Sequence, residues 1–159
     1  MPHIEEHVDI AAPPSEVFRF CHDATHRPDW DEQVMRVELL TPPPIRLGTL
    51  FRVDARYGGG SVFSWDGEYT GFQFPLSSQV RVIDTASSSP FSVRSESSWH
   101  FNSVGSGTRF TWSWDYRPRG ILAGILDRLG GRASTRRAMK NSLESLKAMI
   151  ESGRRAGFN

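Results

Sequence analysis

One short stretch restricts the fold more than any other part of the chain. Between residues 108 and 117, aromatic and polar side chains alternate, and the aromatic ones are Phe110, Trp112, Trp114 and Tyr116. Alternation with a period of two is typical of a β-strand that buries one face and exposes the other to water. Because an apolar sheet face has to be covered by another element, this strand predicts a sheet with a second layer on its aromatic side.

The region from residue 34 to residue 117 predicts a series of strands. Short turn sequences rich in glycine, proline and serine interrupt it, among them GGG at 58–60 and VGSG at 104–107. Connections this short join antiparallel neighbours, so we expect an antiparallel meander. The six predicted strands span residues 34–41, 49–57, 61–73, 78–86, 91–102 and 108–117.

The first thirty residues predict one more strand and two short helices. Ile4, Val8 and Ile10 share one parity, as in a half-buried strand. Proline suits the first turn of a helix, so a short helix is expected from Pro14. Pro28 disfavours helical geometry at the residue before it, and the second short helix is expected after this proline.

The C-terminal region predicts one long helix. Met139, Leu143, Leu146 and Ile150 recur at steps of four, three and four residues, which places them on one helical stripe. This is the one predicted element long enough to cover the apolar face of the sheet. We therefore expect the sheet to curl around it.

Five large aliphatic residues precede this helix, and we expect them to contact the sheet as part of the core. The alternative is a hydrophobic lip at the mouth of a cavity, flanked by Arg117 and Arg119, that touches a membrane. The five residues are Ile121, Leu122, Ile125, Leu126 and Leu129.

Five segments together carry a resemblance to a known family. They are VDIAAPPSEVFRFCHD at 8–23, Asp29-Trp30, LGTLFRV at 47–53, GTRFTWSWDYRPRG at 107–120 and NSLESLKAMIESG at 141–153. The chain resembles the polyketide cyclase/dehydrase and lipid-transport group of the START-like (SRPBCC) superfamily. The resemblance implies an α+β helix-grip fold, shared with the birch pollen allergens, in which a seven-stranded antiparallel curved sheet wraps around a long C-terminal helix. In this superfamily one cavity serves binding proteins, transfer proteins, allergens and a few enzymes.

The composition is that of one globular domain over residues 1–159. The chain is 38% hydrophobic and 23% charged, which is ordinary for a soluble protein. The single cysteine, Cys21, excludes a disulfide within the chain. The sequence has no apolar run long enough to span a bilayer and no visible secretory signal, so we expect a cytoplasmic protein without stable membrane insertion.

The formal net charge of +1 is unevenly distributed. Residues 117–159 carry ten basic and three acidic side chains, a net +7, whereas residues 1–116 carry nine basic and fifteen acidic ones, a net −6. A basic segment fits nucleic acid or an anionic membrane surface, but we favour the solvated face of a helix. We expect no nucleic-acid partner, because the long helix covers the aromatic strand faces that would stack on bases.

The histidines do not predict a metal site. The pairs His3/His7 and His22/His26 both have HxxxH spacing, but residues four apart on a strand lie roughly 13 Å apart, too far to share a metal. The second pair would need a continuous helix, which Pro28 opposes. We interpret these as surface histidines and expect neither a metal nor a cofactor.

No motif assigns a catalytic residue. The chain has no nucleophile elbow and no phosphate-binding loop, and we expect Cys21 to be a buried, unreactive thiol. The resemblance implies that some cyclases of the group use a cavity arginine with tyrosine or serine to stabilise an enolate, but no motif here transfers that role. Arg52 and Arg56 are expected to face solvent; the alternative is an inward Arg56 that holds a ligand carboxylate or enolate.

Aromatic side chains of several strands predict the wall of an internal cavity. Gly67 and Gly71 leave room on that wall, and Ser95 and Ser97 place hydroxyls on it that a ligand or water would bind. The resemblance adds Trp30, at a position that commonly helps close the cavity. The predicted ligand-binding residues are Trp30, Phe51, Tyr57, Phe63, Trp65, Tyr69, Ser95, Ser97, Trp99, Phe110, Trp112 and Trp114.

The sequence thus favours a protein that binds a hydrophobic or aromatic small molecule, lipid or polyketide-like, in an internal cavity. The alternative is a polyketide cyclase or dehydratase that uses the same cavity for positioning and acid–base catalysis. A third interpretation is an interaction module without a ligand, which would have a filled core.

Overall fold

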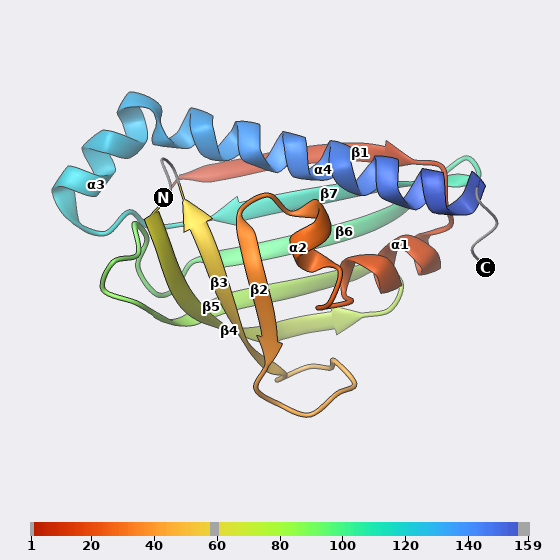
Figure 1. Ribbon diagram of the computed structural model, residues 1–159, viewed down its shortest axis with the longest axis horizontal. Coiled ribbons are helices and arrows are strands. Elements are labelled where there is room, and N and C mark those ends of the chain that lie inside the picture. The colour runs from red at the N-terminus through yellow and green to blue at the C-terminus, as the bar shows by residue number, and fades with distance from the viewer. Residues whose placement is uncertain (1, 58–60, 156–159) are drawn as a thin grey trace.

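The computed structural model describes residues 2–57 and 61–155. Its strands form one antiparallel sheet, in the order β1-β7-β6-β5-β4-β3-β2, which curls around the long helix α4 (Figure 1). This confirms the predicted helix-grip fold. In chain order the elements are β1 (His3–Ile10), α1 (Pro14–Cys21), α2 (Arg27–Trp30), β2 (Val34–Leu39), β3 (Leu50–Tyr57), β4 (Ser61–Gln73), β5 (Ser77–Thr85), β6 (Glu96–Val104), β7 (Gly107–Asp115), α3 (Gly120–Leu126), the π-helical turn η1 (Asp127–Gly131) and α4 (Arg132–Arg155).

The apolar stripe of α4 holds this helix in the core. Met139, Leu143, Leu146 and Ile150 are all buried, and they belong to the larger hydrophobic cluster, with side chains of β1, β6, β7 and α1. Burial of each large aliphatic side chain contributes about 1.5–3 kcal/mol. The stripe predicted from the sequence is therefore confirmed as the buried face.

The two faces of β7 are separated as the alternation predicted. Phe110 and Trp112 are buried on the concave side. On the convex side, Arg109 is exposed and its Nε donates to Asp9 of the paired strand β1 at 2.8 Å. The aromatic face of β7 thus supplies part of the wall beneath α4.

A second hydrophobic cluster lies at the other end of the concave side, on strands β3, β4 and β5. Phe51, Phe63 and Tyr69 are buried within it. Phe72 and Trp114 pack against both clusters, so the two clusters meet at these side chains. The pockets described below lie in this region.

The predicted strand 91–102 is partly wrong, because β6 begins at Glu96. Phe91 makes only an isolated bridge to Pro118. Arg94 has a φ of 75°, in the left-handed region that breaks extended geometry. Residues 86–95 therefore form a loop, and Ser95 does not lie in a strand.

An irregularity in β4 also changes which residues face inward. Tyr69 pairs with Val80 and Gly71 pairs with Gln79, so β4 has one extra residue at this point. An extra residue of this kind moves the side chains that follow it to the opposite face of the sheet. Phe72 therefore lies inside, 5.6 Å from Tyr69 between ring centres. A Cβ on Gly71 would instead meet Cβ of Gln79 at 3.2 Å, so Gly71 does not enlarge the cavity as predicted.

Two expectations about helices are also corrected. Helix α2 begins at Arg27, one residue before Pro28, since a proline at the second position still lies in the first turn. The aliphatic residues of α3 and η1 are exposed and do not contact the sheet as core; they are Ile121, Leu122, Ile125, Leu126 and Leu129. Within residues 2–57 and 61–155, no helix is long and apolar enough to cross a membrane.

Candidate functional site

Two pockets lie within the curled sheet and share three lining residues, Arg27, Trp65 and Ser97. We name them the Tyr69 pocket and the Met139 pocket, after one residue that lines each. Their empty volumes, open space at the mouths included, are about 600 and 630 Å³. Aromatic side chains make up much of both linings, and flat ring systems stack well on such walls.

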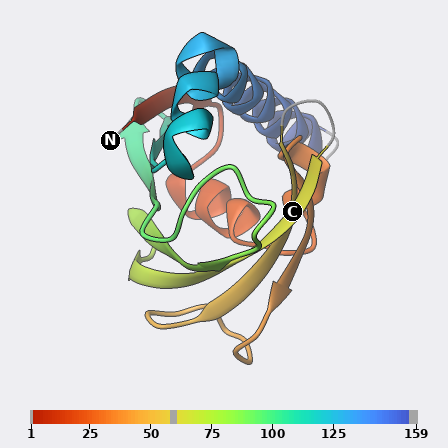
Figure 2. The same ribbon diagram turned by 90° about the vertical axis from the view of Figure 1, so that its left-hand side faces the viewer.

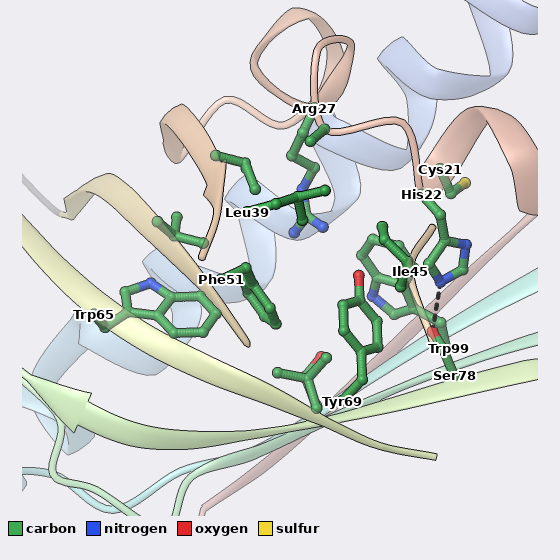
Figure 3. A pocket seen from close by; sticks show the side chains of 15 residues that line it. Cys21, His22, Arg27, Leu39, Ile45, Phe51, Trp65, Tyr69, Ser78 and Trp99 are labelled. Atoms are coloured by element: carbon green, nitrogen blue, oxygen red, sulfur yellow. Dashed lines mark hydrogen bonds between the residues drawn. The ribbon is translucent and has the colours of Figure 1, made fainter. Parts of the chain in front are cut away.

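Arg27 brings a charged group to the space that both pockets share. It begins the short helix α2, and its guanidinium points into the Tyr69 pocket between Leu39 and Trp99 (Figure 3). The guanidinium carbon lies 4.8, 4.5 and 5.4 Å from the ring centres of Trp30, Trp99 and Trp112. Contacts of this kind between a cation and an aromatic face are attractive, and more so where water is excluded.

Asp31 fixes the position of this guanidinium. Nε and Nη2 of Arg27 lie 2.8 and 2.6 Å from the Asp31 carboxylate, whose side chain is only 2% exposed. The other carboxylate oxygen accepts from the backbone N–H of Gln33 at 3.1 Å and from the Ser142 hydroxyl of α4 at 3.5 Å. The pair is thus attached to both α2 and α4, and the pocket arginine has little freedom to move.

His22 lines the Tyr69 pocket in an uncharged state. Its Nδ1 donates to the Phe18 carbonyl at 2.7 Å, so Nε2 accepts from the Ser78 hydroxyl at 2.8 Å (Figure 3). The ring stacks on Phe18 at 4.1 Å and lies 5.1 Å from Trp99. Burial among these rings lowers the pKa of His22 to about 4.

Tyr69 presents a hydroxyl to the same pocket. Figure 3 shows this hydroxyl pointing into the pocket, toward the side from which Arg27 enters. Burial raises the pKa of Tyr69 to about 12, against the smaller opposing effect of the Arg27 charge. The phenol therefore stays protonated at neutral pH and is a hydrogen-bond donor for an oxygen atom.

Cys21 lies at the edge of this arrangement, and its thiol is not held in the thiolate form. It is buried, and burial raises the pKa of its thiol far above the ordinary value. Because the thiolate is the reactive form, the expected unreactive thiol fits this environment. Within the described residues, no three His, Cys, Asp or Glu side chains lie where they would hold a metal ion.

Comparison with known proteins places the chain in a family. The sequence pattern of the family described as "Polyketide cyclase / dehydrase and lipid transport" matches residues 1–151. The chain belongs to this family. The resemblance predicted from the sequence, to this group of the SRPBCC superfamily, is confirmed. No curated protein matches the chain significantly.

Several solved structures share the fold of this protein at low sequence identity. The Zhui aromatase/cyclase from Streptomyces sp. R1128 is 19% identical with a TM-score of 0.82, and the match covers 99% of this chain and 98% of that one. The protein TTHA0849 from Thermus thermophilus is 21% identical with a TM-score of 0.79, over 96% and 99%. The major latex-like protein 151 from Panax ginseng is 14% identical with a TM-score of 0.71, over 93% and 96%.

Most of the predicted cavity residues line one or both of the two pockets. Phe51, Tyr69 and Trp99 line the Tyr69 pocket. Those on the Met139 pocket are Phe63, Trp112 and Trp114, while Trp65 and Ser97 line both. The side chain of Tyr57 lies outside the described part of the chain.

Three predicted residues belong elsewhere, because core packing or local bonding uses them. Trp30 and Phe110 are almost fully buried in the larger cluster and line neither pocket. The Ser95 hydroxyl donates to the Ser92 carbonyl at 3.0 Å within the 86–95 loop. Ser97 lines both pockets, but its hydroxyl already accepts from Trp112 Nε1 at 3.1 Å. The Ser95 hydroxyl is thus used within the loop, whereas the Ser97 O–H still has a hydrogen that it can donate to a ligand.

Two further predictions concern the free space beside the glycines of the cavity wall and the orientation of the two arginines of β3. Gly67 leaves no free space, because a Cβ there would lie 2.5 Å from Cζ of Phe51. Arg52 is exposed and pairs with Asp66 at 2.7 Å on the convex face. Arg56 is also exposed, as predicted, but it lies at the rim of the Met139 pocket.

Sequence reasoning missed Arg27 and His22. His22 is not a surface histidine: it caps the end of α1 and its ring lies in the Tyr69 pocket. A signal for Arg27 exists in the sequence RPDWD, since residues 27 and 31 are one helical turn apart. An arginine and an aspartate at that spacing, around a buried tryptophan, indicate a partly buried ion pair.

Proposed function

We propose that this protein binds a flat aromatic or otherwise hydrophobic small molecule that carries an oxygen atom, in the Tyr69 and Met139 pockets. The observation that carries the proposal is Arg27, held by Asp31 against tryptophan rings with its guanidinium inside a mainly apolar cavity. Apolar walls with a few convergent polar groups are typical of small-molecule sites. The family description, which includes lipid transport, is in agreement.

The polar groups of the site determine where an oxygen atom of the ligand would lie. A guanidinium has five N–H donors, and the contacts to Asp31 involve only Nε and Nη2. Arg27 therefore keeps donors for a ligand oxygen, and the protonated Tyr69 hydroxyl adds another. A carbonyl or phenol oxygen near Arg27 would leave the ring system of the ligand against Trp65 and Phe51.

The charge of the site favours neutral ligands over anions. Arg27 and Asp31 together carry no net charge, and Asp31 is buried beside the guanidinium. An anion would be attracted by Arg27, but the adjacent Asp31 carboxylate would offset part of that attraction. We therefore expect binding of a neutral planar compound to depend little on ionic strength, because little of it is Coulombic.

The test is a titration followed by tryptophan fluorescence. 1,8-Dihydroxyanthraquinone, palmitate and inorganic phosphate are added separately to the protein at low and at high salt. We expect the anthraquinone to quench fluorescence with nearly the same affinity at both salt concentrations, and phosphate to have no effect. Absence of quenching by the planar and the fatty ligand alike would overturn the proposal.

A matched pair of variants assigns the site. Arg27→Lys keeps the charge but loses the planar fork of donors, and we expect anthraquinone binding to weaken about tenfold, or about 1.4 kcal/mol. Arg36→Lys, an exposed arginine on β2, should bind as the wild type does. Equal affinity of all three proteins would place the ligand away from Arg27.

An enzyme that cyclises a poly-ketone is the second candidate, and the shared orientation of Arg27 and Tyr69 favours it. In an aldol condensation, an α-carbon loses a proton to give an enolate, the enolate carbon bonds to a ketone carbon whose oxygen takes up a proton, and that hydroxyl then leaves as water with a neighbouring hydrogen. A guanidinium beside the enolate oxygen and a phenol donating to the ketone oxygen would stabilise the developing charge. Incubation with a linear poly-β-ketone thioester tests this: a cyclised product about 18 mass units lighter, lost in Tyr69→Phe, would support catalysis.

A further inference from the structure

The segment formed by α3 and η1, residues 120–131, exposes large aliphatic side chains, which a helix ordinarily buries. Ile121, Leu122 and Leu129 are 85%, 70% and 78% exposed, and Ile125 and Leu126 are about half exposed. With about 3.6 residues per helical turn, these five side chains fall on one side of the segment. We call this surface the aliphatic lip.

The opposite side of the same segment faces the protein and is made of small and polar groups. Ala123 and Gly124 are partly buried there, and Asp127 is buried. The Asp127 carboxylate accepts hydrogen bonds from the Tyr116 hydroxyl and, at 3.2 Å, from Arg132. The orientation of the segment is thus fixed by a buried polar contact, and the lip faces outward as part of the folded structure.

The lip lies at one end of the molecule, beside the 86–95 loop. Figure 1 shows α3 projecting beyond the end of the sheet, and Figure 2 shows it next to this loop on the face turned to the viewer. Hydrogen bonds join the two: the Arg119 N–H donates to the Pro90 carbonyl at 3.0 Å, and the Ser92 N–H to the Arg117 carbonyl at 2.8 Å. The lip therefore protrudes at this end of the molecule, although Ile121 and Ile125 also line a shallow pocket together with Pro2 and Pro118.

Positive charge surrounds the lip. Between residues 117 and 137 the chain has one acidic residue, Asp127, which is buried and paired. Arg117, Arg119 and Arg128 are exposed. At the nearby end of β7, Asp115 pairs with His3 at 2.7 Å, and the exposed Glu96 lies opposite Asp115 on β6. Exposed aliphatic side chains flanked by arginines are the features by which a helix lies in an anionic membrane surface.

A third pocket lies directly beneath the lip. It is lined by Leu126 and Ala123 above and by Phe91 and Trp114 below, with an empty volume of about 750 Å³ including its mouth. Phe91 and Trp114 also line the Met139 pocket. The space under the lip and the proposed ligand site are therefore neighbours that share these two side chains as walls.

We propose that the aliphatic lip docks on the surface of an anionic lipid bilayer. Its aliphatic side chains enter the boundary between headgroups and acyl chains, and the surrounding arginines contact lipid phosphates. Docking brings the pocket beneath Leu126 to the bilayer, and an apolar ligand passes there between the membrane and the Met139 pocket. This passage rests on the proposed function, whereas the docking does not.

A protruding apolar surface fits a bilayer better than it fits a protein partner. Leu122 and Leu129 are 70% and 78% exposed at this end, and a protein would need a matching groove to cover them, whereas lipids rearrange around them. The basic residues add an electrostatic attraction to anionic lipid. Salt at moderate concentration screens this attraction beyond a distance of about 10 Å. The proposal therefore requires both the aliphatic and the basic residues.

The test is flotation of the ligand-free protein with phosphatidylglycerol-containing vesicles and with pure phosphatidylcholine vesicles. We expect the wild type to float with the anionic vesicles and not with the neutral ones. The variant Leu122→Ser/Leu129→Ser, which changes exposed side chains only, should lose at least about tenfold in membrane affinity. The control Leu47→Ser/Leu76→Ser removes leucines that are 66% and 58% exposed elsewhere, and it should float as the wild type does.

The charge requirement is tested in the same assay. Arg119→Gln/Arg128→Gln and high salt should each weaken flotation, whereas Arg46→Gln, an exposed arginine on the β2–β3 connection, should not. No flotation of the wild type, or equal loss in both leucine variants, would overturn the proposal. So would a dimer, or capture of an acidic protein, that depends on the lip without vesicle binding. Anthraquinone titration of the leucine variant in solution separates docking from ligand binding, since it should keep wild-type affinity.

Discussion

The guanidinium carbon of Arg27 lies 4.5 Å from the ring centre of Trp99, in contact with the aromatic wall of the ligand pocket. The helix that carries Arg27 has only four residues, so its own hydrogen bonds cannot position the side chain firmly. Position comes instead from Asp31, which is buried and also accepts from α4. The pocket arginine thus depends on a contact between the first third of the chain and the last helix.

The first prediction concerns this ion pair. Arg27→Met should destabilise the protein by about 3 kcal/mol, because it leaves the buried Asp31 carboxylate without its partner. Urea unfolding measures the change. The double variant Arg27→Met/Asp31→Asn should recover most of the loss, and a single variant as stable as the wild type would show that the pair is solvated.

The second prediction concerns pH. His22 has a pKa of about 4 in the folded protein because burial disfavours its charged form, against about 6.5 in the unfolded chain. The unfolded state therefore binds more protons than the folded state between these two pH values. The contribution of His22 to the free energy of unfolding is full above about pH 6.5 and decreases as the pH falls toward 4. Between pH 7 and pH 5 the free energy of unfolding should fall by about 2 kcal/mol from this group.

The control for this pH dependence is another histidine. His22→Gln should flatten the profile between pH 7 and pH 5, while His100→Gln, which changes an exposed ring on β6, should leave the slope as it is. The carboxyls of Asp9 and Asp23, whose pKa values are lowered mainly by hydrogen bonds from Arg109 and Thr25, titrate below this window. An unchanged slope in His22→Gln would contradict the uncharged, buried state of this residue.

The third prediction concerns the floor of the Tyr69 pocket. Gly67→Ala places a Cβ 2.5 Å from Cζ of Phe51 and 2.9 Å from Cζ3 of Trp65, so these two pocket-lining rings, above all that of Phe51, must shift. Overpacking of this kind costs about 1–3 kcal/mol, and ligand affinity should fall as well. Gly67→Ala/Phe51→Leu should regain stability; a single variant with normal stability and affinity would mean that the ring has other space.

The fourth prediction tests the buried stripe of α4. Leu143 is 1% exposed, and Leu143→Asp would bury an unpaired carboxylate at a cost of several kcal/mol, comparable to the whole stability of a domain. We expect this variant not to fold, as judged by circular dichroism and thermal melting. Ser145→Asp, on the exposed side of the same helix, should melt near the wild-type temperature.

Strand and helix periodicity predicted the fold because most elements bury one face only. The alternation of Phe110 and Trp112 and the stripe through Leu143 both report a buried face directly. The predicted inward positions near Gly71 were wrong, because a shift in strand pairing after Tyr69 exchanges the two faces and leaves no mark in the alternation. The order of the strands was thus predictable, but the inward face at this shift was not.

The site was less predictable than the fold for a related reason. Polar residues in the pocket are placed by tertiary contacts: Arg27 by Asp31 and tryptophan rings, and His22 by Ser78 on a distant strand. Spacing along the chain shows such contacts only where the partners are neighbours in sequence. The aliphatic residues near Leu122 were expected in the core because composition alone cannot tell a buried apolar side from an exposed one.

The central claim is that the cavity beside Arg27 holds a flat, oxygen-bearing ligand, and a crystal structure of the protein with 1,8-dihydroxyanthraquinone tests it most directly. The account predicts the ring system against Trp65 and Phe51, with one ligand oxygen about 3 Å from a guanidinium nitrogen of Arg27. A cavity that stays without the compound at saturating concentration, or a compound bound only on the convex face of the sheet, would contradict the account.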